Sequence, residues 1–399
     1  MHMTKTSPWL VVFALLGCAG NADVSDGAAE LATDLGGSAL ADLESARPAV
    51  TTLRVHYPLP ATGSLSVRGS LAPLSWTSGA TMTQKSDTVF ELQVRGLKAP
   101  LEWKPLLGDM TWSRGSNYIA QPGQTVDIYP HFVSGKGRYV RHLSAFHSTL
   151  LGNNRGVWLY LPPSFDENPL ARYPVVYMHD GQNLFDPRAA FGGRTWQVSE
   201  TLDAGIDALD ASLHIPEVVV VGPENAGAQR IYEYTPTPDA MYMDGGGGDL
   251  YLRFLRDELK PAIERDALLK DRLLTDREHT ALAGSSLGGL ISAYGGLRQP
   301  DVWSRLGIFS PSTWWDDGYI LNQVTAATGL TPRWSRVYVD SGSPSDDTEN
   351  TAKLAAKYRG LGYSDGSDFK YVLAPGAAHN EDAWAARLPA ALRFLCGGW

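Results

Sequence analysis

The sequence predicts an α/β fold, with a doubly wound and mostly parallel sheet, preceded by a small all-β sandwich. Two patterns carry this prediction. From about residue 137 onward, apolar strand-like runs alternate with segments whose apolar residues recur at helical spacing. Between residues 51 and 132, short runs alternate apolar and polar residues and are separated by turn-forming residues. A chain of 399 residues, 43% hydrophobic and 19% charged, can build two folded cores.

The net charge and the distribution of charged residues indicate which kinds of partner the chain can bind. The formal net charge is −9, and Lys and Arg do not cluster anywhere along the chain. Nucleic acid is therefore not an expected partner. The 12 Trp and 17 Tyr are many for this length, and such side chains often line sites for sugars or aryl groups.

Residues 1–18 are typical of an export signal peptide. Lys5 supplies a positive start, and the apolar run from Pro8 to Leu16 is too short to span a bilayer. The run ends in Leu15-Leu16-Gly17-Cys18, which resembles the bacterial lipoprotein box. That resemblance implies cleavage before Cys18, lipidation of its sulfur and anchoring to the cell envelope, at the outer membrane in a Gram-negative cell. An ordinary secreted protein with a chance cysteine is the alternative.

Cysteine usage agrees with a lipoprotein. The chain has two cysteines, and an exported protein stabilised by disulfides would show more. If Cys18 carries lipid, Cys396 is expected to be a buried thiol. Residues 19–50 are rich in Ala, Asp, Gly and Ser, which predicts a flexible tether.

Residues 51–132 form the predicted sandwich. The stretches VRGSLAPLSW and LEWKPLLGDMTWSRGSN resemble the immunoglobulin-like starch-binding modules that precede many carbohydrate enzymes. The resemblance implies that Trp76, Trp103 and Trp112 stack on sugar. A spacer module that uses these rings for packing is the alternative.

Residues 137–399 form the predicted α/β domain. The continuous β-branched run within 217–227 is typical of a buried parallel strand. Leu250, Leu252, Leu255 and Leu259 recur at helical spacing. The further expected strands are 156–163, 173–181, 279–286, 304–312 and 335–343, and the further expected helices are 287–299, 350–362 and 380–395.

A Gly-x-Ser-x-Gly pentapeptide, residues 284–288, lies between an expected strand and an expected helix. That context is the one a nucleophile elbow requires. The register makes Ser286 the central residue and Ser285 the variable one. The backbone N–H of Leu287 then lies at a helix N-terminus, where it can donate to an oxyanion.

A serine hydroxyl needs a base, and α/β hydrolases place their triad in the order Ser, acid, His. His379 is the one histidine of nine that follows Ser286, so elimination names it as the base. The acid is expected in the loop after strand 335–343. Asp346 is preferred and Asp347 is the alternative; Asp340 and Glu349 are weaker candidates, with Asp340 expected to support the loop.

The second oxyanion donor is expected in residues 175–186, where Gly181 permits a close backbone approach and the N–H of Gly181 or Gln182 can point into the site. The neighbouring His179 and Asp180 have no second cluster with ligand spacing, so no metal and no cofactor are expected.

Five segments in order, within about 137–394, resemble the putative-esterase family of α/β hydrolases, which includes feruloyl and acetylxylan esterases, siderophore esterases and mycolyltransferases. They are YPVVYMHDGQNLFD, VGPENAGAQRIYEYTP, FLRDELKPAIE, ALAGSSLGGLISAYGGLRQPDVWSRLGIFSPSTWW and GAAHNEDAWAARLPAALRFL. The resemblance implies that Ser286 is the nucleophile and His379 the base. It also implies site-shaping or substrate-binding positions at Arg230, Glu233, Tyr234, Trp314 and Trp315, for which structural support is the alternative.

The expected activity is ester hydrolysis through an acyl-enzyme. The favoured substrate is an extracellular, carbohydrate-linked ester of acetyl or feruloyl type. A siderophore lactone esterase is the main alternative, and a non-catalytic glycan-binding lipoprotein is the other.

Overall fold

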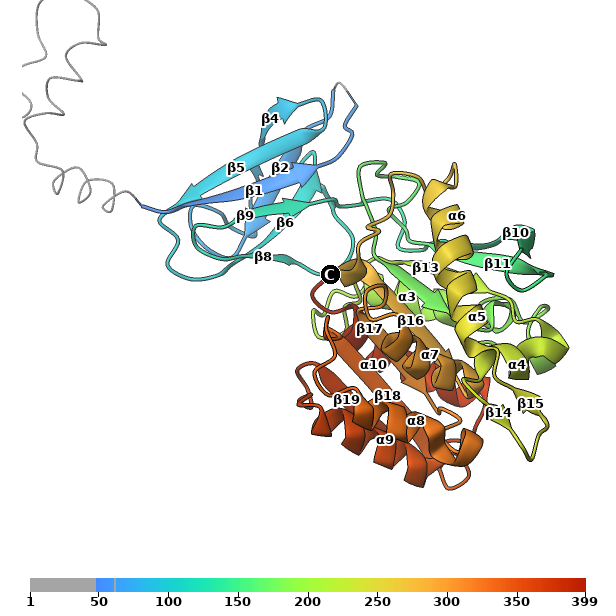
Figure 1. The fold of residues 1–399 in the computed structure, drawn as a ribbon. Helices are drawn as coiled ribbons and strands as arrows, with labels where there is room; N and C mark the ends of the chain where they lie inside the picture. Colours follow the sequence, from blue (N-terminus) through green and yellow to red (C-terminus); the bar gives the residue numbers. More distant parts are fainter. Residues whose placement is uncertain (1–47, 61) are drawn as a thin grey trace, which may run out of the picture.

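The computed structural model describes residues 48–60 and 62–399 of the chain (Figure 1). The predicted signal peptide, the lipidation site Cys18 and nearly all of the predicted tether lie outside the described residues. Within the described part, no helix is long and apolar enough to cross a membrane.

The N-terminal part is all β and contains two sheets. One has the strand order β4-β5-β1-β9, and the other has the order β3-β2-β6-β7 with β8 paired to β6. The strands are β1 (Val50–His56), β2 (Leu65–Gly69), β3 (Ala80–Thr81), β4 (Thr83–Ser86), β5 (Val89–Arg95), β6 (Leu101–Leu107), β7 (Thr111–Trp112), β8 (Tyr118–Ala120) and β9 (Thr125–Ile128). Apolar residues of both sheets, such as Leu53 and Val67, share one core.

The three tryptophans of this module separate into two groups. Trp103, on β6, is fully buried in the shared core, so the expectation that it stacks on sugar is wrong. Trp76 and Trp112 are 37% and 38% exposed. Their rings lie near each other, with centroids 6.1 Å apart and planes at 44°.

The C-terminal part contains one eight-stranded sheet of order β10-β11-β13-β12-β16-β17-β18-β19. Its strands are β10 (Arg138–Ser148), β11 (Asn153–Leu161), β12 (Val175–Met178), β13 (Val219–Pro223), β16 (Thr280–Ser285), β17 (Arg305–Phe309), β18 (Arg336–Ser343) and β19 (Phe369–Pro375). The strands from β13 to β19 pair in parallel, whereas β10 and β11 are antiparallel. Strand β10 was not predicted.

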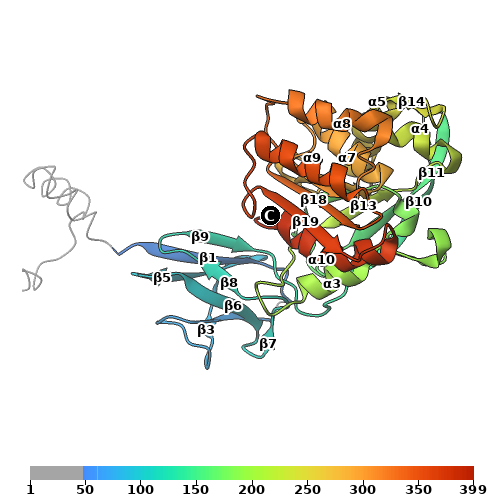
Figure 2. The same ribbon diagram turned by 90° about the horizontal axis from the view of Figure 1, so that it is seen from below.

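Helices cover both faces of the sheet (Figure 2). They are α3 (Val198–Ile206), α4 (Arg230–Tyr234), α5 (Gly248–Arg253), α6 (Lys260–Arg265), α7 (Leu287–Arg298), α8 (Trp315–Ala326), α9 (Thr348–Gly360) and α10 (Glu381–Cys396). Neighbouring residues of β12 face opposite ways: Val175 joins the core under α5 to α9, and Val176 joins the core under α3 and α10. This is the doubly wound arrangement that the sequence predicts.

Two segments depart from the expected pattern. The predicted helix 249–266 is interrupted by a π-helical stretch, Phe254–Leu259, between α5 and α6. A short hairpin of β14 (Pro238–Asp239) and β15 (Asp244–Gly245) projects between α4 and α5 (Figure 1). Cys396, in α10, is buried as expected.

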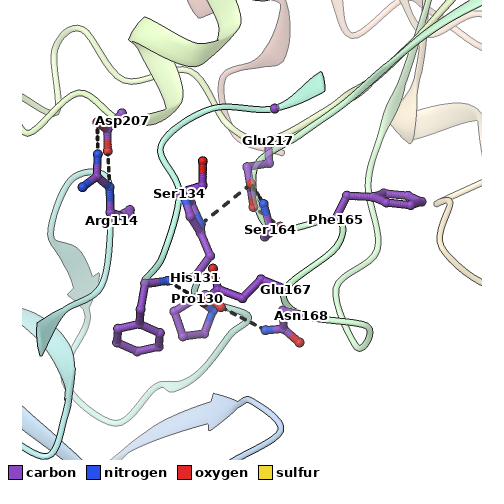
Figure 3. Close-up of polar contacts among 12 residues, drawn as sticks. Arg114, Pro130, His131, Ser134, Ser164, Phe165, Glu167, Asn168, Asp207 and Glu217 are labelled. Carbon is purple, nitrogen blue, oxygen red and sulfur yellow. Dashed lines mark hydrogen bonds and ion pairs between the residues drawn. The ribbon is translucent and has the colours of Figure 1, made fainter. Parts of the chain in front are cut away.

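Polar contacts join the two parts of the chain (Figure 3). Glu167 accepts a hydrogen bond from the backbone N–H of Phe132 at 2.7 Å. Nδ2 of Asn168 donates to the backbone oxygens of His56 and Pro130 in the N-terminal part. Arg114 forms an ion pair with Asp207. Because these partners come from both parts, the junction has a defined geometry.

Candidate active site

Residues with catalytic potential follow the carboxyl ends of the parallel strands. Ser286 follows β16, Ser310 follows β17, Asp346 lies beyond β18, and His379 lies beyond β19. The carboxyl ends of parallel strands meet at one edge of the sheet, which is where α/β folds place their ligand sites. The topology therefore gathers side chains that are far apart in the sequence.

Ser286 occupies a strained turn between β16 and α7. Its φ of 58° and ψ of −124° place it in a region that side-chain-bearing residues rarely adopt. A Cβ added at Gly284 would lie 2.8 Å from Cδ2 of His179 and 2.9 Å from the backbone of Gly288. The glycine is therefore required for the strand and the helix to approach this closely.

The elbow presents Ser286 and buries Ser285. Both serines border a cavity of about 610 Å³, but Ser285, at the end of β16, is 4% exposed, whereas Ser286 is half-buried. The Ser286 hydroxyl lies 3.4 Å from the Ser312 hydroxyl. His379 lines the same cavity, and among the described residues no hydrogen bond joins it to Ser286 in this state. Of the two serines, Ser286 is therefore the more accessible to a substrate in this cavity.

Asp346, and not Asp347, contacts His379. Oδ1 of Asp346 is hydrogen-bonded to Nδ1 of His379. A carboxylate can only accept, so Nδ1 carries the proton and Nε2 is left as the basic nitrogen. Asp347 instead accepts from Nδ2 of Asn350 at 2.8 Å, at the start of α9. Of the two candidate acids, Asp346 is therefore the one that the structure places against His379.

Hydrogen bonds keep the buried Asp346 ionised. Burial by itself would raise the pKa of this carboxyl group. Bonds from His379, from the Ser310 hydroxyl at 2.6 Å and from the Gly342 N–H outweigh burial and hold the pKa below its ordinary value. Asp340 lies behind this group, bonded to Arg387, so it supports the loop as expected.

Of the expected oxyanion donors, Gln182 lines the same cavity, and Leu287 and Gly181 are chain neighbours of residues that line it. Leu287 begins α7, and the first N–H groups of a helix have no acceptor within the helix. Gly181 is packed so closely against β13 that an added Cβ would lie 2.0 Å from the Gly222 oxygen. A side chain at position 181 would push this loop away from the sheet.

An ion pair holds the loop that carries Gly181 and Gln182. Asp180 precedes Gly181 in a left-handed conformation, with φ 57°. Arg230 donates to both of its carboxylate oxygens, at 2.7 and 2.8 Å, and Asn225 donates at 2.7 Å. Burial would raise the Asp180 pKa, but the charge of Arg230 and these bonds lower it. Arg230 lines the cavity as expected, whereas the sequence assigned no such role to Asp180.

Tyr234 and Trp315 do not line the cavity. Both are fully buried: Tyr234 packs beneath Arg230, and Nε1 of Trp315 donates to the Thr237 oxygen at 2.8 Å. Glu233 is also buried, in an ion pair with Arg155. The expectation that these residues meet substrate is corrected to a supporting role, because each is enclosed by protein. Trp314 is partly exposed, beside Tyr242, and lies outside the cavity lining.

The putative esterase family model matches residues 148–395. The chain belongs to this family. It is 30% identical over 197 residues to the uncharacterized protein YbbA of Bacillus subtilis, a match covering 48% of this chain and 68% of YbbA. It is 29% identical over 194 residues to the ferri-bacillibactin esterase BesA of Bacillus subtilis, covering 45% of this chain and 62% of BesA.

Two solved structures share the fold of this esterase-family chain. An IroE-like serine hydrolase from Shewanella oneidensis superposes with a TM-score of 0.51 at 22% identity, over 65% of this chain and 80% of its own. The BES protein from Bacillus cereus superposes with a TM-score of 0.50 at 20% identity, over 66% and 96%. These likenesses show that the chain shares the mixed α/β fold of the two structures.

Trp384 and Glu381 of this family member also line the cavity, and sequence reasoning missed both. Trp384 lies edge-on to the His379 ring, with centroids 5.1 Å apart. Glu381 accepts from Asn183 at 3.3 Å, and burial raises the pKa of its carboxyl group. Glu381 and Trp384 follow His379 on the first turns of α10, so their spacing from the histidine was the available signal.

Proposed function

We propose that this chain is a serine carboxylic-ester hydrolase with Ser286 as nucleophile, His379 as base and Asp346 as acid. One observation carries the proposal: His379, whose Nδ1 is bonded to the buried Asp346, borders the same cavity as a serine held on a strained elbow. Membership of the putative esterase family supports the same chemistry.

In the proposed reaction, Oγ of Ser286 attacks the ester carbonyl carbon while Nε2 of His379 takes the hydroxyl proton. The carbonyl oxygen becomes an oxyanion that accepts from the N–H of Leu287 and from an N–H of the Gly181–Gln182 loop. Collapse breaks the ester C–O bond, and the alcohol leaves with the proton from His379. Water then adds to the acyl-enzyme by the same route and releases the carboxylic acid.

For the substrate, we propose an extracellular carbohydrate-linked ester of acetyl or feruloyl type. The exposed rings of Trp76 and Trp112 support this, because they border a cavity of about 570 Å³ at the junction with the α/β part. Lys104 and Asn117 add polar groups to the same cavity. An aromatic pair beside hydrogen-bonding groups suits a sugar, which presents both C–H faces and hydroxyls. The N-terminal part would then act as a carbohydrate-binding module.

The charges of the catalytic cavity also favour a neutral substrate. Asp180 is balanced by Arg230, while Glu381 adds a carboxylate with no cation bonded to it among the described residues. A multiply anionic iron–catecholate complex would be repelled by this group, whereas a neutral glycan ester would not.

The second candidate is a siderophore lactone esterase. Relatives support it directly, since BesA and the iron(III) enterobactin esterase of Dickeya dadantii bear such names, although the chain covers only 62% and 32% of their lengths. The test compares kcat/KM on acetylated and feruloylated glycans with kcat/KM on cyclic catecholate lactones. Higher efficiency on the lactones would replace the carbohydrate proposal.

We further propose that the chain is exported and held at the cell envelope through lipid on Cys18, as the lipoprotein-like segment suggests. Metabolic labelling with a fatty-acid analogue tests this, since a Cys18→Ser variant should lose the label. The remaining candidate, a non-catalytic glycan-binding lipoprotein, predicts that no substrate in the screen is turned over.

A further inference from the structure

The Ser310 hydroxyl lies directly behind the Asp346–His379 pair. It donates to Oδ2 of Asp346 at 2.6 Å. It also accepts two hydrogen bonds, from Nε1 of Trp384 at 3.0 Å and from Nη2 of Arg387 at 2.9 Å. All four groups are buried, so water does not compete for these positions.

These contacts fix the direction of the Ser310 proton. A serine hydroxyl has two acceptor sites and one proton. The N–H groups of Trp384 and Arg387 can only donate, and they fill both acceptor sites. The proton is therefore left with Oδ2 of Asp346 as its partner, and the hydroxyl cannot rotate without breaking a bond.

The backbone and the neighbouring ion pair hold Ser310 in this position. Ser310 has a φ of 38°, in the left-handed region, and its N–H donates to Asp340. Arg387 donates to both carboxylate oxygens of Asp340, at 2.7 and 3.1 Å. Non-glycine residues persist in such conformations only where the surroundings enforce them, and they gather at functional sites.

We propose that Ser310 is a positioning residue for catalysis: its locked hydroxyl holds Oδ2 of Asp346 so that Oδ1 faces Nδ1 of His379. This inference rests on the proposed hydrolase function. The Gly342 N–H also donates to Oδ2, and a carboxylate held by that single contact can rotate about it. His379 then loses its fixed orientation toward Ser286. Ser310 itself does not line the cavity, so it acts through Asp346.

The charged groups around Asp346 explain why the Ser310 hydroxyl is needed to hold the carboxylate in place. His379 faces Oδ1, and Nη2 of Arg387 lies 4.0 Å from Oδ2. Asp340 neutralises Arg387 from the far side, and Asp347 is the next residue in the chain. Without the Ser310 hydroxyl, Oδ2 would keep the Gly342 N–H as its one bonded donor among the described residues, and the nearby charge of Arg387 would draw the carboxylate away from His379.

The test is Ser310→Ala, with Ser164→Ala as its matched control. Ser164 is also buried and also donates to a carboxylate at 2.6 Å, that of Glu217, but it lies at the domain junction. We expect Ser310→Ala to lower kcat on an aryl acetate at least about tenfold while KM changes less than about twofold, since a bond to a charged group is lost. The downfield Nδ1 proton resonance of His379 should move. Ser164→Ala should change neither.

A second variant separates positioning from folding. Ser310→Gly also removes the hydroxyl, but glycine tolerates the positive φ, so this variant should fold even if Ser310→Ala does not. A native melting curve with unchanged kcat and an unmoved Nδ1 resonance in Ser310→Gly would overturn the inference. If Ser286→Ala also kept wild-type turnover, the proposed function would fail instead, so the two failures are distinguishable.

Discussion

Replacing Arg230 with methionine tests how the Asp180–Gln182 loop is held. The change removes both N–H···O contacts to Asp180, at 2.7 and 2.8 Å, and leaves a carboxylate that is 8% exposed with Asn225 as its remaining side-chain partner. Breaking a buried pair from one side costs about 3–5 kcal/mol; Arg230 is 25% exposed, so we expect about 3 kcal/mol less unfolding free energy. Because the loop carries a proposed oxyanion donor, kcat should also fall, by about tenfold or more.

The stability loss should depend on pH. The native-state pKa of Asp180 is lowered by Arg230, so the pair contributes above the pKa of the unfolded carboxyl group and is lost as the pH falls through the native one. Wild type and variant should therefore differ most near neutral pH and converge in acid. Urea unfolding at several pH values measures this. The control is Arg188→Met, which breaks a pair whose arginine is 86% exposed and should change the unfolding free energy much less. Equal losses in the two variants would refute the reasoning.

Three further predictions concern the site and the core. Asp346→Asn should lower kcat by up to about ten-thousand-fold, because the imidazole loses its tautomer, while Asp347→Asn should cost far less; steady-state kinetics on an aryl acetate decides. Glu381→Gln should raise kcat/KM for an anionic ester about fivefold relative to a neutral one, with Asp382→Asn as control. Since burial raises the Glu381 pKa, the wild-type bias should appear only as the pH rises through that value, and a pH-independent bias would contradict it. Burial raises the pKa of Cys396 to about 12, so its thiol should resist a disulfide reagent at pH 8 until the protein unfolds, and prompt labelling of native protein would count against the described packing.

Local sequence patterns were enough to locate the elbow and to single out His379 as the candidate base. A glycine-flanked serine between a strand and a helix identified Ser286, and chain order left only His379 downstream. The doubly wound sheet was predicted because strand-like apolar runs alternate along the chain with segments whose apolar residues recur at helical spacing. Strand β10 was not predicted because all but one of its residues are exposed or half-buried, so its apolar pattern is weak. The N-terminal strands were anticipated, but the alternation could not tell that Trp103 faces inward while Trp112 faces outward.

The fold was needed to tell which candidate acid contacts His379 and to find the side-chain contacts that hold the site residues in place. Asp346 and Asp347 are adjacent in the sequence, and the left-handed turn at Asp347, with φ 45°, sends its side chain to the start of α9 instead. The Asp180–Arg230 pair joins residues 50 positions apart, and the Ser310–Asp346 contact joins residues 36 apart. Such contacts depend on which strand ends meet at the edge of the sheet, and no local pattern encodes them.

Reaction with a fluorophosphonate probe, followed by peptide mass spectrometry, tests the central claim most directly. The probe phosphonylates a serine only when a base and an oxyanion site activate it. We predict one modified residue, Ser286, in the full chain, with labelling strongly reduced in His379→Ala and abolished in Ser286→Ala. Native melting curves should accompany both variants. Labelling at another serine, or a natively folded Ser286→Ala variant that still hydrolyses esters, would contradict the account.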